Sequence, residues 1–225
     1  MKNHYLLSIA LLIALASFTN IASAQVPSGP SDGTLAAPIN ASDVGKVLCA
    51  GTTISIAGPQ NGGVDFTAYQ WYKLDASGNK QLTASTGRTY TETPTAPGYY
   101  NYEVVTVNAT GCTSPVSDVF KVYVLPPLTA TITGTAALCA GVGTTVLTAN
   151  PTPATGFVLT YQWTRSGVNI ANATTNTYTI TGENTPGTIT FGVNIAYVLS
   201  PSCTVTATDD VVIEPVPTKP SITAN

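Results

Sequence analysis

The sequence of this chain contains a repeat of about 100 residues that occurs twice. Each repeat must therefore form a complete fold by itself or together with the other repeat. The tripeptide Tyr-Gln-Trp recurs with its tryptophan 92 residues later. The matching segments follow in the same order: "VLCAGTTISIAG" at 47–58 and "ALCAGVGTTVLTAN" at 137–150, "AYQWYK" at 68–73 and "TYQWTR" at 160–165, and "TYTET" at 89–93 and "TYTIT" at 177–181. The chain therefore contains one structural unit twice.

Each copy has the pattern of about seven short strands separated by turns of Gly, Pro, Asn and Ser. Apolar and polar residues alternate at 53–56 and at 204–206. Strands of this kind bury one face only, so two sheets must cover each other. Hydrophobic residues make up 44% of the chain and the net charge is only −3, which excludes a disordered chain. The sequence predicts an all-β protein of two tandem β-sandwiches.

The two tryptophans, Trp71 and Trp163, occupy the same place in both copies. Each lies in the middle of an expected strand, where a large aromatic side chain fills the space between two sheets. The alternative is a platform on which a sugar ring stacks. Because one tryptophan at the same place in both units indicates a structural role, we expect both to be core residues.

The order Cys, strand, YQW, TYT, PG, Cys resembles the immunoglobulin-like repeats that are strung in tandem in large secreted and surface-attached bacterial proteins, including adhesins. The resemblance covers nearly all of the chain after residue 24. It implies two immunoglobulin-like β-sandwich domains, and modules of this type mostly act as spacers or binding units. It also implies a tyrosine corner near Tyr100, whereas the second unit lacks the tyrosine cluster of "GYYNYEV".

The first residues, 1–24, have the pattern of a cleaved signal peptide. Lys2 precedes an apolar run at 6–16, and small residues at 22–24 provide the cleavage site. The run is shorter than the roughly 18 to 20 residues that cross a bilayer, so we expect no membrane insertion of the mature chain. The sequence predicts a secreted protein, with the periplasm, the cell surface and the medium all open.

The domain boundaries follow from the repeat and from the prolines of "LPPL" at 125–128. We expect the first immunoglobulin-like domain at 25–126, the second at 127–216, and a tail at 217–225. In the tail, Pro220, Ser221, Ile222 and Thr223 resemble the first strand of a further repeat. Three interpretations apply to them: a frayed end, part of a longer array, or a strand that adds to a sheet edge of the next molecule and so joins copies into a fibre.

The two units differ at their beginnings. "LTATITG" at 128–134 is a well-alternating first strand for the second unit. The corresponding lead-in of the first unit, "LAAPINASDVG" at 35–45, contains Pro38 and little alternation. Because proline cannot donate to a strand ladder, we expect the first strand of the first unit to be short or poorly paired.

The four cysteines of the chain allow three disulfide pairings. We expect Cys49 to pair with Cys112 and Cys139 with Cys203, because a repeat favours equivalent bonds within each unit and export makes oxidation possible. Each pair is separated by 63 or 64 residues and would close one end of its sandwich. No CxxC occurs, so the cysteines do not predict a metal site.

The sequence predicts no catalytic chemistry, cofactor or metal. Its one histidine, His4, lies in the expected signal peptide, so mechanisms that need imidazole are excluded for the mature chain. The carboxylates are scattered rather than paired as in a glycosidase. Asp209 and Asp210 are adjacent and could join a calcium site, but a solvated start of the last strand is the favoured explanation for them.

These observations predict a secreted, non-enzymatic structural or adhesive module of the bacterial cell surface or extracellular matrix. Its partners would be a protein or glycan at the cell surface, or further copies of itself as a homo-polymer. The pI near 4.9 and the lack of a basic cluster exclude nucleic acid. The alternative is a carbohydrate-binding or accessory protein of a polysaccharide-degrading system, which would use exposed tyrosines such as Tyr72, Tyr99 and Tyr102.

Overall fold

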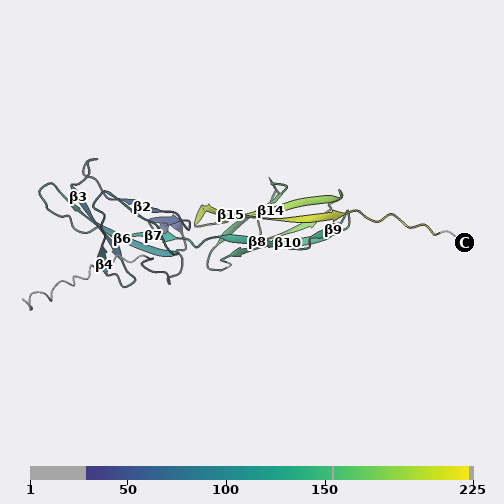
Figure 1. Ribbon diagram of the computed structural model, residues 1–225, viewed down its shortest axis with the longest axis horizontal. Coiled ribbons are helices and arrows are strands. Elements are labelled where there is room, and N and C mark those ends of the chain that lie inside the picture. The colour runs from purple at the N-terminus through teal and green to yellow at the C-terminus, as the bar shows by residue number, and fades with distance from the viewer. Residues whose placement is uncertain (1–28, 154, 223–225) are drawn as a thin grey trace, which may run out of the picture.

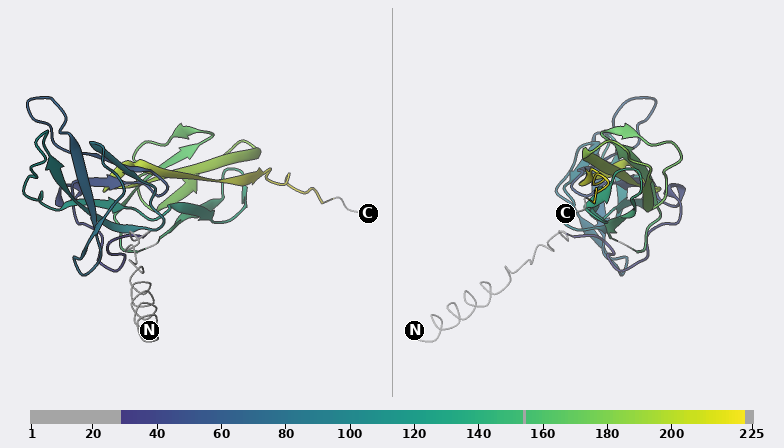
Figure 2. Two further views of the ribbon diagram at one scale, coloured as in Figure 1. Left: turned by 60° about the vertical axis from the view of Figure 1, so that its left-hand side comes forward. Right: turned by 90° about the vertical axis from the view of Figure 1, so that its right-hand side faces the viewer.

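The structure, a computed structural model, describes residues 29–153 and 155–222, so the expected signal peptide lies outside the described residues. Two sandwiches lie end to end along one long axis, and the tail leaves the far end of the second (Figure 1). The view along that axis shows the two sandwiches nearly superposed (Figure 2). The described part of the chain is all-β apart from a short 3-10 helix at Ala41–Asp43.

The first sandwich packs a five-stranded sheet, in the order β1-β7-β6-β3-β4, against a two-stranded sheet of β2 and β5. All neighbours are antiparallel except β1 and β7, which run parallel. Its strands are β1 (Lys46–Leu48), β2 (Ile54–Ala57), β3 (Ala68–Leu74), β4 (Lys80–Leu82), β5 (Thr89–Glu92), β6 (Gly98–Val107) and β7 (Phe120–Val124).

The second sandwich repeats this plan with one strand more. Its sheets have the orders β12-β11-β14-β15-β9 and β13-β10-β8, and the parallel pair is β9 with β15. Its strands are β8 (Thr129–Thr133), β9 (Ala137–Cys139), β10 (Thr144–Thr152), β11 (Leu159–Arg165), β12 (Val168–Asn169), β13 (Thr177–Thr181), β14 (Gly187–Tyr197) and β15 (Ser200–Glu214). Both units are immunoglobulin-like β-sandwiches.

The repeated tryptophans lie in the two cores. Trp71 on β3 is 3% exposed and Trp163 on β11 is fully buried. Each indole Nε1 donates a hydrogen bond of 2.9 Å to a backbone carbonyl, of Gly87 and of Thr175 respectively. The ring therefore fills the space between the sheets while its one polar group is satisfied.

A tyrosine corner is present in the first sandwich, where the Tyr100 hydroxyl donates to the carbonyl of Ala96 at 2.8 Å. Gly98 lies opposite Val124 and Gly187 lies opposite Ile213, so Ile189 takes the position of Tyr100 in the second sandwich. Isoleucine has no hydroxyl, which is why the second unit has no such corner.

The expected weakness of the first strand is confirmed. In the second sandwich, β8 pairs with β10 along Thr129–Thr133. In the first sandwich, the residues before β1 form the 3-10 helix and one isolated bridge between Asp32 and Tyr99, and no described strand precedes β1. As a result β2 is paired only with β5 among the described residues, and its other edge has no ladder.

Candidate functional site

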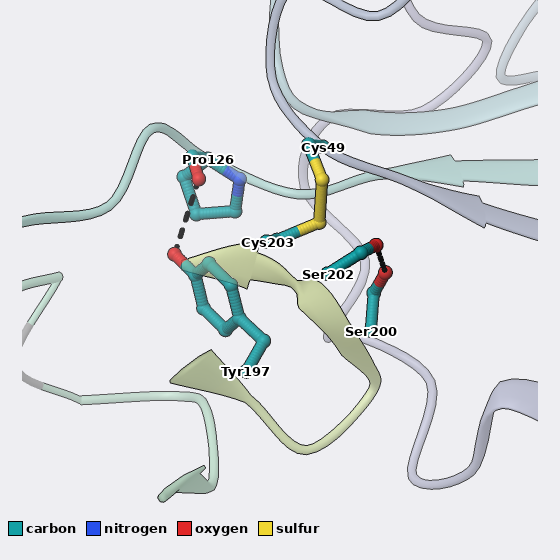
Figure 3. The surroundings of a disulfide bond; sticks show 6 residues. All are labelled: Cys49, Pro126, Tyr197, Ser200, Ser202 and Cys203. Atoms are coloured by element: carbon teal, nitrogen blue, oxygen red, sulfur yellow. Dashed lines mark hydrogen bonds between the residues drawn. A yellow bond between two sulfur atoms is a disulfide. The ribbon is translucent and has the colours of Figure 1, made fainter. Parts of the chain in front are cut away.

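The disulfide bond of this structure joins the two sandwiches. Cys49 is bonded to Cys203 across 154 residues of sequence, with their Cα atoms 5.4 Å apart. Figure 3 shows the bond beside Pro126 of the linker and Tyr197 of the second sandwich. Cys112 and Cys139 are free and exposed. The predicted pairs Cys49 with Cys112 and Cys139 with Cys203 are therefore wrong.

Strand directions explain this pairing in the first sandwich. Cys49 directly follows β1, whose last residue, Leu48, lies opposite Val124 at the start of the linker. Cys112 instead follows the far end of β6, where Thr113 lies opposite Val107. A ten-residue strand such as β6 is roughly 30 Å long, whereas disulfide-bonded Cα atoms lie within about 7 Å. The two cysteines of one unit are at opposite ends of its sandwich.

The same arrangement separates the cysteines of the second sandwich. Cys203 lies near the beginning of β15, beside the first sandwich, and Cys139 lies opposite Glu214 at the end of the same strand. The disulfide consequently connects the near ends of the two units. The two free thiols are left at the far ends of the molecule.

A buried apolar cluster surrounds the disulfide. Tyr123, Leu125, Tyr197 and Cys203 form its centre, and residues from both units pack against them: Ala37, Val44, Val47, Cys49, Tyr99, Leu128, Phe157, Leu159 and Leu199. Tyr99 and Tyr123 make an edge-to-face contact with ring centroids 4.8 Å apart. The Tyr197 hydroxyl donates to the carbonyl of Pro126 at 3.1 Å. Covalent bond, apolar contact and linker together hold the two units in one relative position.

Tyrosines of this cluster resist ionisation. Burial, and secondarily the neighbouring Tyr123, raises the pKa of Tyr197 to about 12. Burial, and secondarily Tyr99, also raises the pKa of Tyr123. Since a tyrosine of the unfolded chain ionises near pH 10, the folded state holds these protons more tightly than the unfolded state does.

We therefore expect the protein to lose stability as the pH rises from about 10 to about 12, with full stability below that window. For Tyr197 alone, the loss at about pH 11 amounts to about 1 kcal/mol, because the folded pKa lies about two units above the unfolded value. Urea denaturation at about pH 9 and pH 11, with free thiols alkylated, measures it. Tyr197→Phe should show a smaller loss; an unchanged pH dependence would contradict the assignment.

The core of the first sandwich contains a buried ion pair that the sequence analysis missed. The ammonium of Lys73 on β3 is fully buried and pairs with Glu92 on β5 of the opposite sheet. Tyr90 and Tyr102 donate to the same carboxylate, at 2.9 and 2.8 Å. Burial and the Glu92 charge raise the pKa of both tyrosines well above the ordinary value. This arrangement ties the two sheets together, and alternation from Tyr69 through Trp71 was a signal that Lys73 points inward.

An open groove of about 660 Å³ runs along the unpaired edge of β2. Its lining is mostly apolar. The residues that line it are Lys46, Ser55, Ile56, Ala57, Pro59, Trp71, Tyr102, Glu103, Val104, Ser117, Asp118 and Phe120. Ile56 lies opposite Tyr90 as Leu147 lies opposite Tyr178, so β2 corresponds to β10. Since β8 pairs with β10 and contacts β15, the groove is the place that a first strand would fill.

The described part of the tail forms no strand within its own molecule. Beyond Glu214 the described residues 215–222 are exposed and have no strand pairing, and Ile222 is fully exposed. Thr223 lies outside the described residues. In Figure 2 the tail continues away from both sandwiches. The apolar side chain of Ile222 is therefore available for contact with another molecule.

The tyrosines proposed as a sugar-binding surface do not form one. Tyr102 is buried, and Tyr72 and Tyr99 are half-buried, so the description of all three as exposed is wrong. The Tyr99 hydroxyl donates to the carbonyl of Ala36 at 3.1 Å, and that of Tyr72 contacts Gln70 at 3.4 Å. These contacts belong to the fold.

The candidate acidic positions also remain apart. Asp209 and Asp210 lie within β15 rather than at its start, and the Asp210 carboxylate accepts a bond from the Thr190 hydroxyl at 2.6 Å. Among residues 29–153 and 155–222, no group of three or more His, Cys, Asp or Glu side chains could hold a metal ion. Within the same residues, no helix has the length and apolar character to cross a membrane.

No family model matches this chain, and no curated protein matches it. Solved structures similar to it include the fibronectin(III)-like modules of Clostridium thermocellum CbhA, with 16% identity over 81% of this chain and 96% of that chain and a TM-score of 0.41. The amphioxus IgVJ-C2 molecule shares 15% identity over 74% of this chain and 99% of that chain, with a TM-score of 0.36. Three N-terminal domains of the bacteriophage RB49 highly immunogenic outer capsid protein share 16% identity over 74% of this chain and 56% of that chain, with a TM-score of 0.36.

Proposed function

We propose that this protein is a secreted, non-enzymatic structural or adhesive module of the bacterial cell surface or extracellular matrix, and that its copies assemble head to tail by strand addition. The observation that carries the proposal is the groove along β2, where no described residue of the first sandwich forms the strand that β8 supplies to the second. The tail of the next copy in line would provide that strand.

The sequence of the tail supports this role. In β8, Ile132 is half-buried and packs against the second core, and Ile222 has the same surroundings in sequence, "TIT" and "SIT". Val124 near the end of the first unit corresponds to Ile213 near the end of the second. Ile132 of β8 follows Val124 by eight residues, and Ile222 of the tail follows Ile213 by nine. The tail is therefore as long as the segment that carries β8 into the second sandwich, and it can reach the groove of a neighbour. In the groove, Ile222 would be buried instead of exposed to water.

The hydrogen bonds of β2 determine where the strand can pair. Gly58 N donates to Arg88 O. The backbone N–H and C=O groups of even-numbered residues of β2 therefore point toward β5, and those of odd-numbered residues point toward the groove. Pro59 has no N–H, and the backbone of Asn61 already pairs with that of Val64. The backbone N–H and C=O groups of Ser55 and Ala57 therefore lie on the groove side of β2, and we expect the added strand to pair with them.

Proline in the tail is compatible with this pairing. Ala149 N donates to Asn176 O, away from β8, so the bonds between β10 and β8 are made by residues 148, 150 and 152. Ala130, at the position of Pro220, lies between these bonding positions. A proline there removes no hydrogen bond of the ladder.

Deletion of residues 217–225 should abolish concentration-dependent polymers while leaving both sandwiches folded. The test uses a Cys112→Ser, Cys139→Ser background, so that exposed thiols contribute nothing and the bond between the units stays intact. Light scattering and electron microscopy measure assembly, and circular dichroism checks the fold. Ile222→Asp should act like the deletion, and Ser221→Ala, which keeps the apolar contact, should not. If the parent protein stays monomeric at high concentration, strand addition is wrong.

A carbohydrate-binding role is the second candidate, and the same groove favours it. Trp71 beside Asp118 and Glu103 gives an aromatic and polar lining of the kind that small ligands use. A glycan array separates the two functions. Glycan binding that a peptide of residues 217–225 does not displace would favour this candidate over strand addition.

A further inference from the structure

The bond between the two units identifies partners for the two free cysteines. Cys139 has the position in the second sandwich that Cys49 has in the first. Cys49 directly follows β1 and Cys139 is the last residue of β9, and each of these short strands runs parallel to the last strand of its unit. Both cysteines lie in the sequence "LCAG". The carbonyl of each then accepts a turn hydrogen bond, from Thr52 N and from Gly143 N.

Cys112 has the position in the first sandwich that Cys203 has in the second. Thr113 lies opposite Val107 near the end of β6, and Thr204 lies opposite Ala196 near the end of β14. The cysteine precedes the threonine in both places. The bonded pair Cys49 and Cys203 therefore has an unbonded counterpart, Cys139 and Cys112.

We propose that Cys139 of one copy forms a disulfide with Cys112 of the next copy, so that the bond between the two units of one chain is repeated between chains. This inference rests on the proposed head-to-tail assembly. A tail strand that enters the first sandwich of the next copy places Cys139 beside Cys112, as β8 and the linker place Cys49 beside Cys203.

The two free cysteines cannot meet within one molecule. Cys112 lies beyond the far end of β6 and Cys139 at the far end of β15. Since the sandwiches lie end to end (Figure 1), strands of ten and fifteen residues put roughly 80 Å between the thiols. Only a second copy can bring the partner thiol within bonding distance.

The reaction is a two-electron oxidation that needs a disulfide as oxidant, such as glutathione disulfide or an exported thiol-disulfide oxidoreductase. The Cys139 thiolate attacks the oxidant, which releases one thiol and leaves a mixed disulfide. The Cys112 thiolate then attacks the Cys139 sulfur and releases the second thiol. Two protons and two electrons pass from the cysteines to the oxidant.

The surfaces beside the free thiols are more polar than the cluster around Cys49 and Cys203. Leu125, which is fully buried, corresponds to the exposed Glu214, since Val124 and Ile213 are equivalent. Tyr197 corresponds to the exposed Asn108. Val107, which pairs with Thr113, directly precedes Asn108, and Ala196, which pairs with Thr204, directly precedes Tyr197. Apolar contact is thus weaker between copies than between units, and the disulfide would carry more of the junction.

The test mixes two single variants, Cys112→Ser and Cys139→Ser, in a glutathione redox buffer. Each variant keeps one of the two thiols, so a bond between Cys139 and Cys112 forms only between the two different chains. Non-reducing electrophoresis and peptide mapping measure the products. We expect the mixed dimer to exceed each symmetric dimer by at least about tenfold, because docking raises the effective concentration of the correct partner. The wild-type chain should form a ladder of multimers under the same conditions.

Mixed and symmetric dimers in random proportion would show that exposed thiols merely collide, and would overturn the proposal. A mixture that remains monomeric would overturn it too, as would a new bond between Cys49 and Cys112. Repeating the mixture without residues 217–225 separates the two proposals. Mixed dimer that persists without the tail supports the disulfide against strand addition. Polymers of the double serine variant, together with no mixed dimer, support strand addition against the disulfide.

Discussion

Glu92→Gln is expected to destabilise the first sandwich by about 3 to 5 kcal/mol, because it removes the carboxylate charge that pairs with the fully buried ammonium of Lys73. It also weakens the bonds that Tyr90 and Tyr102 donate to the carboxylate. Chemical denaturation followed by the fluorescence of Trp71 measures the loss. The Lys73→Met, Glu92→Leu double variant should recover most of it, since both charges of the buried pair are then removed.

A matched control is available in the second sandwich. Arg165 and Glu183 form an ion pair of 2.8 Å in which the arginine side chain is 46% exposed. Glu183→Gln should change the free energy of unfolding by no more than about 1 kcal/mol, as for other exposed pairs. Equal losses from Glu92→Gln and Glu183→Gln would mean that the buried pair has no special role in the first sandwich.

Trp163→Ala is expected to destabilise the second sandwich by about 3 to 5 kcal/mol. The indole is fully buried and packs against Tyr178, so its removal leaves a cavity in the core and removes the hydrogen bond to the carbonyl of Thr175. Trp71→Ala should be less damaging, because Trp71 lines the open groove and the space that it leaves can fill with water.

Denaturation followed by the remaining tryptophan and by circular dichroism separates the two variants. Trp163→Phe, which keeps most of the apolar volume, serves as the control and should lose markedly less than the alanine variant. A loss near zero for Trp163→Ala would show that the indole does not support the core. It would also revive the interpretation of the repeated tryptophans as sugar platforms.

Much of the fold could be predicted because local sequence carries it. Alternation and turn residues predict the sandwiches, and Pro38 correctly predicts that the lead-in of the first unit forms no proper first strand. Lys73 could also have been found, since it shares the inward face of β3 with Tyr69 and Trp71. The inward position of Lys73, one member of the buried ion pair, was therefore predictable from the sequence.

The disulfide pairing could not be predicted from the repeat alone. A repeat shows which cysteines occupy equivalent positions. Two disulfide patterns are consistent with that equivalence: a bond within each unit, or a bond from each unit to the next. The choice depends on which end of the sandwich each cysteine occupies, and this follows from the parallel strand pairs β1 with β7 and β9 with β15. The groove likewise depends on how β2 and β7 lie in space, which no local pattern records.

The bond between Cys49 and Cys203 also governs how far the chain can extend under load. It encloses residues 50–202, a stretch of 153 residues whose contour length is roughly 500 Å. Tension applied at the lead-in and at the tail passes through the sulfur atoms, so none of this length is released even when a sandwich unfolds. Between the lead-in and the tail, the length of the loaded molecule therefore stays nearly constant.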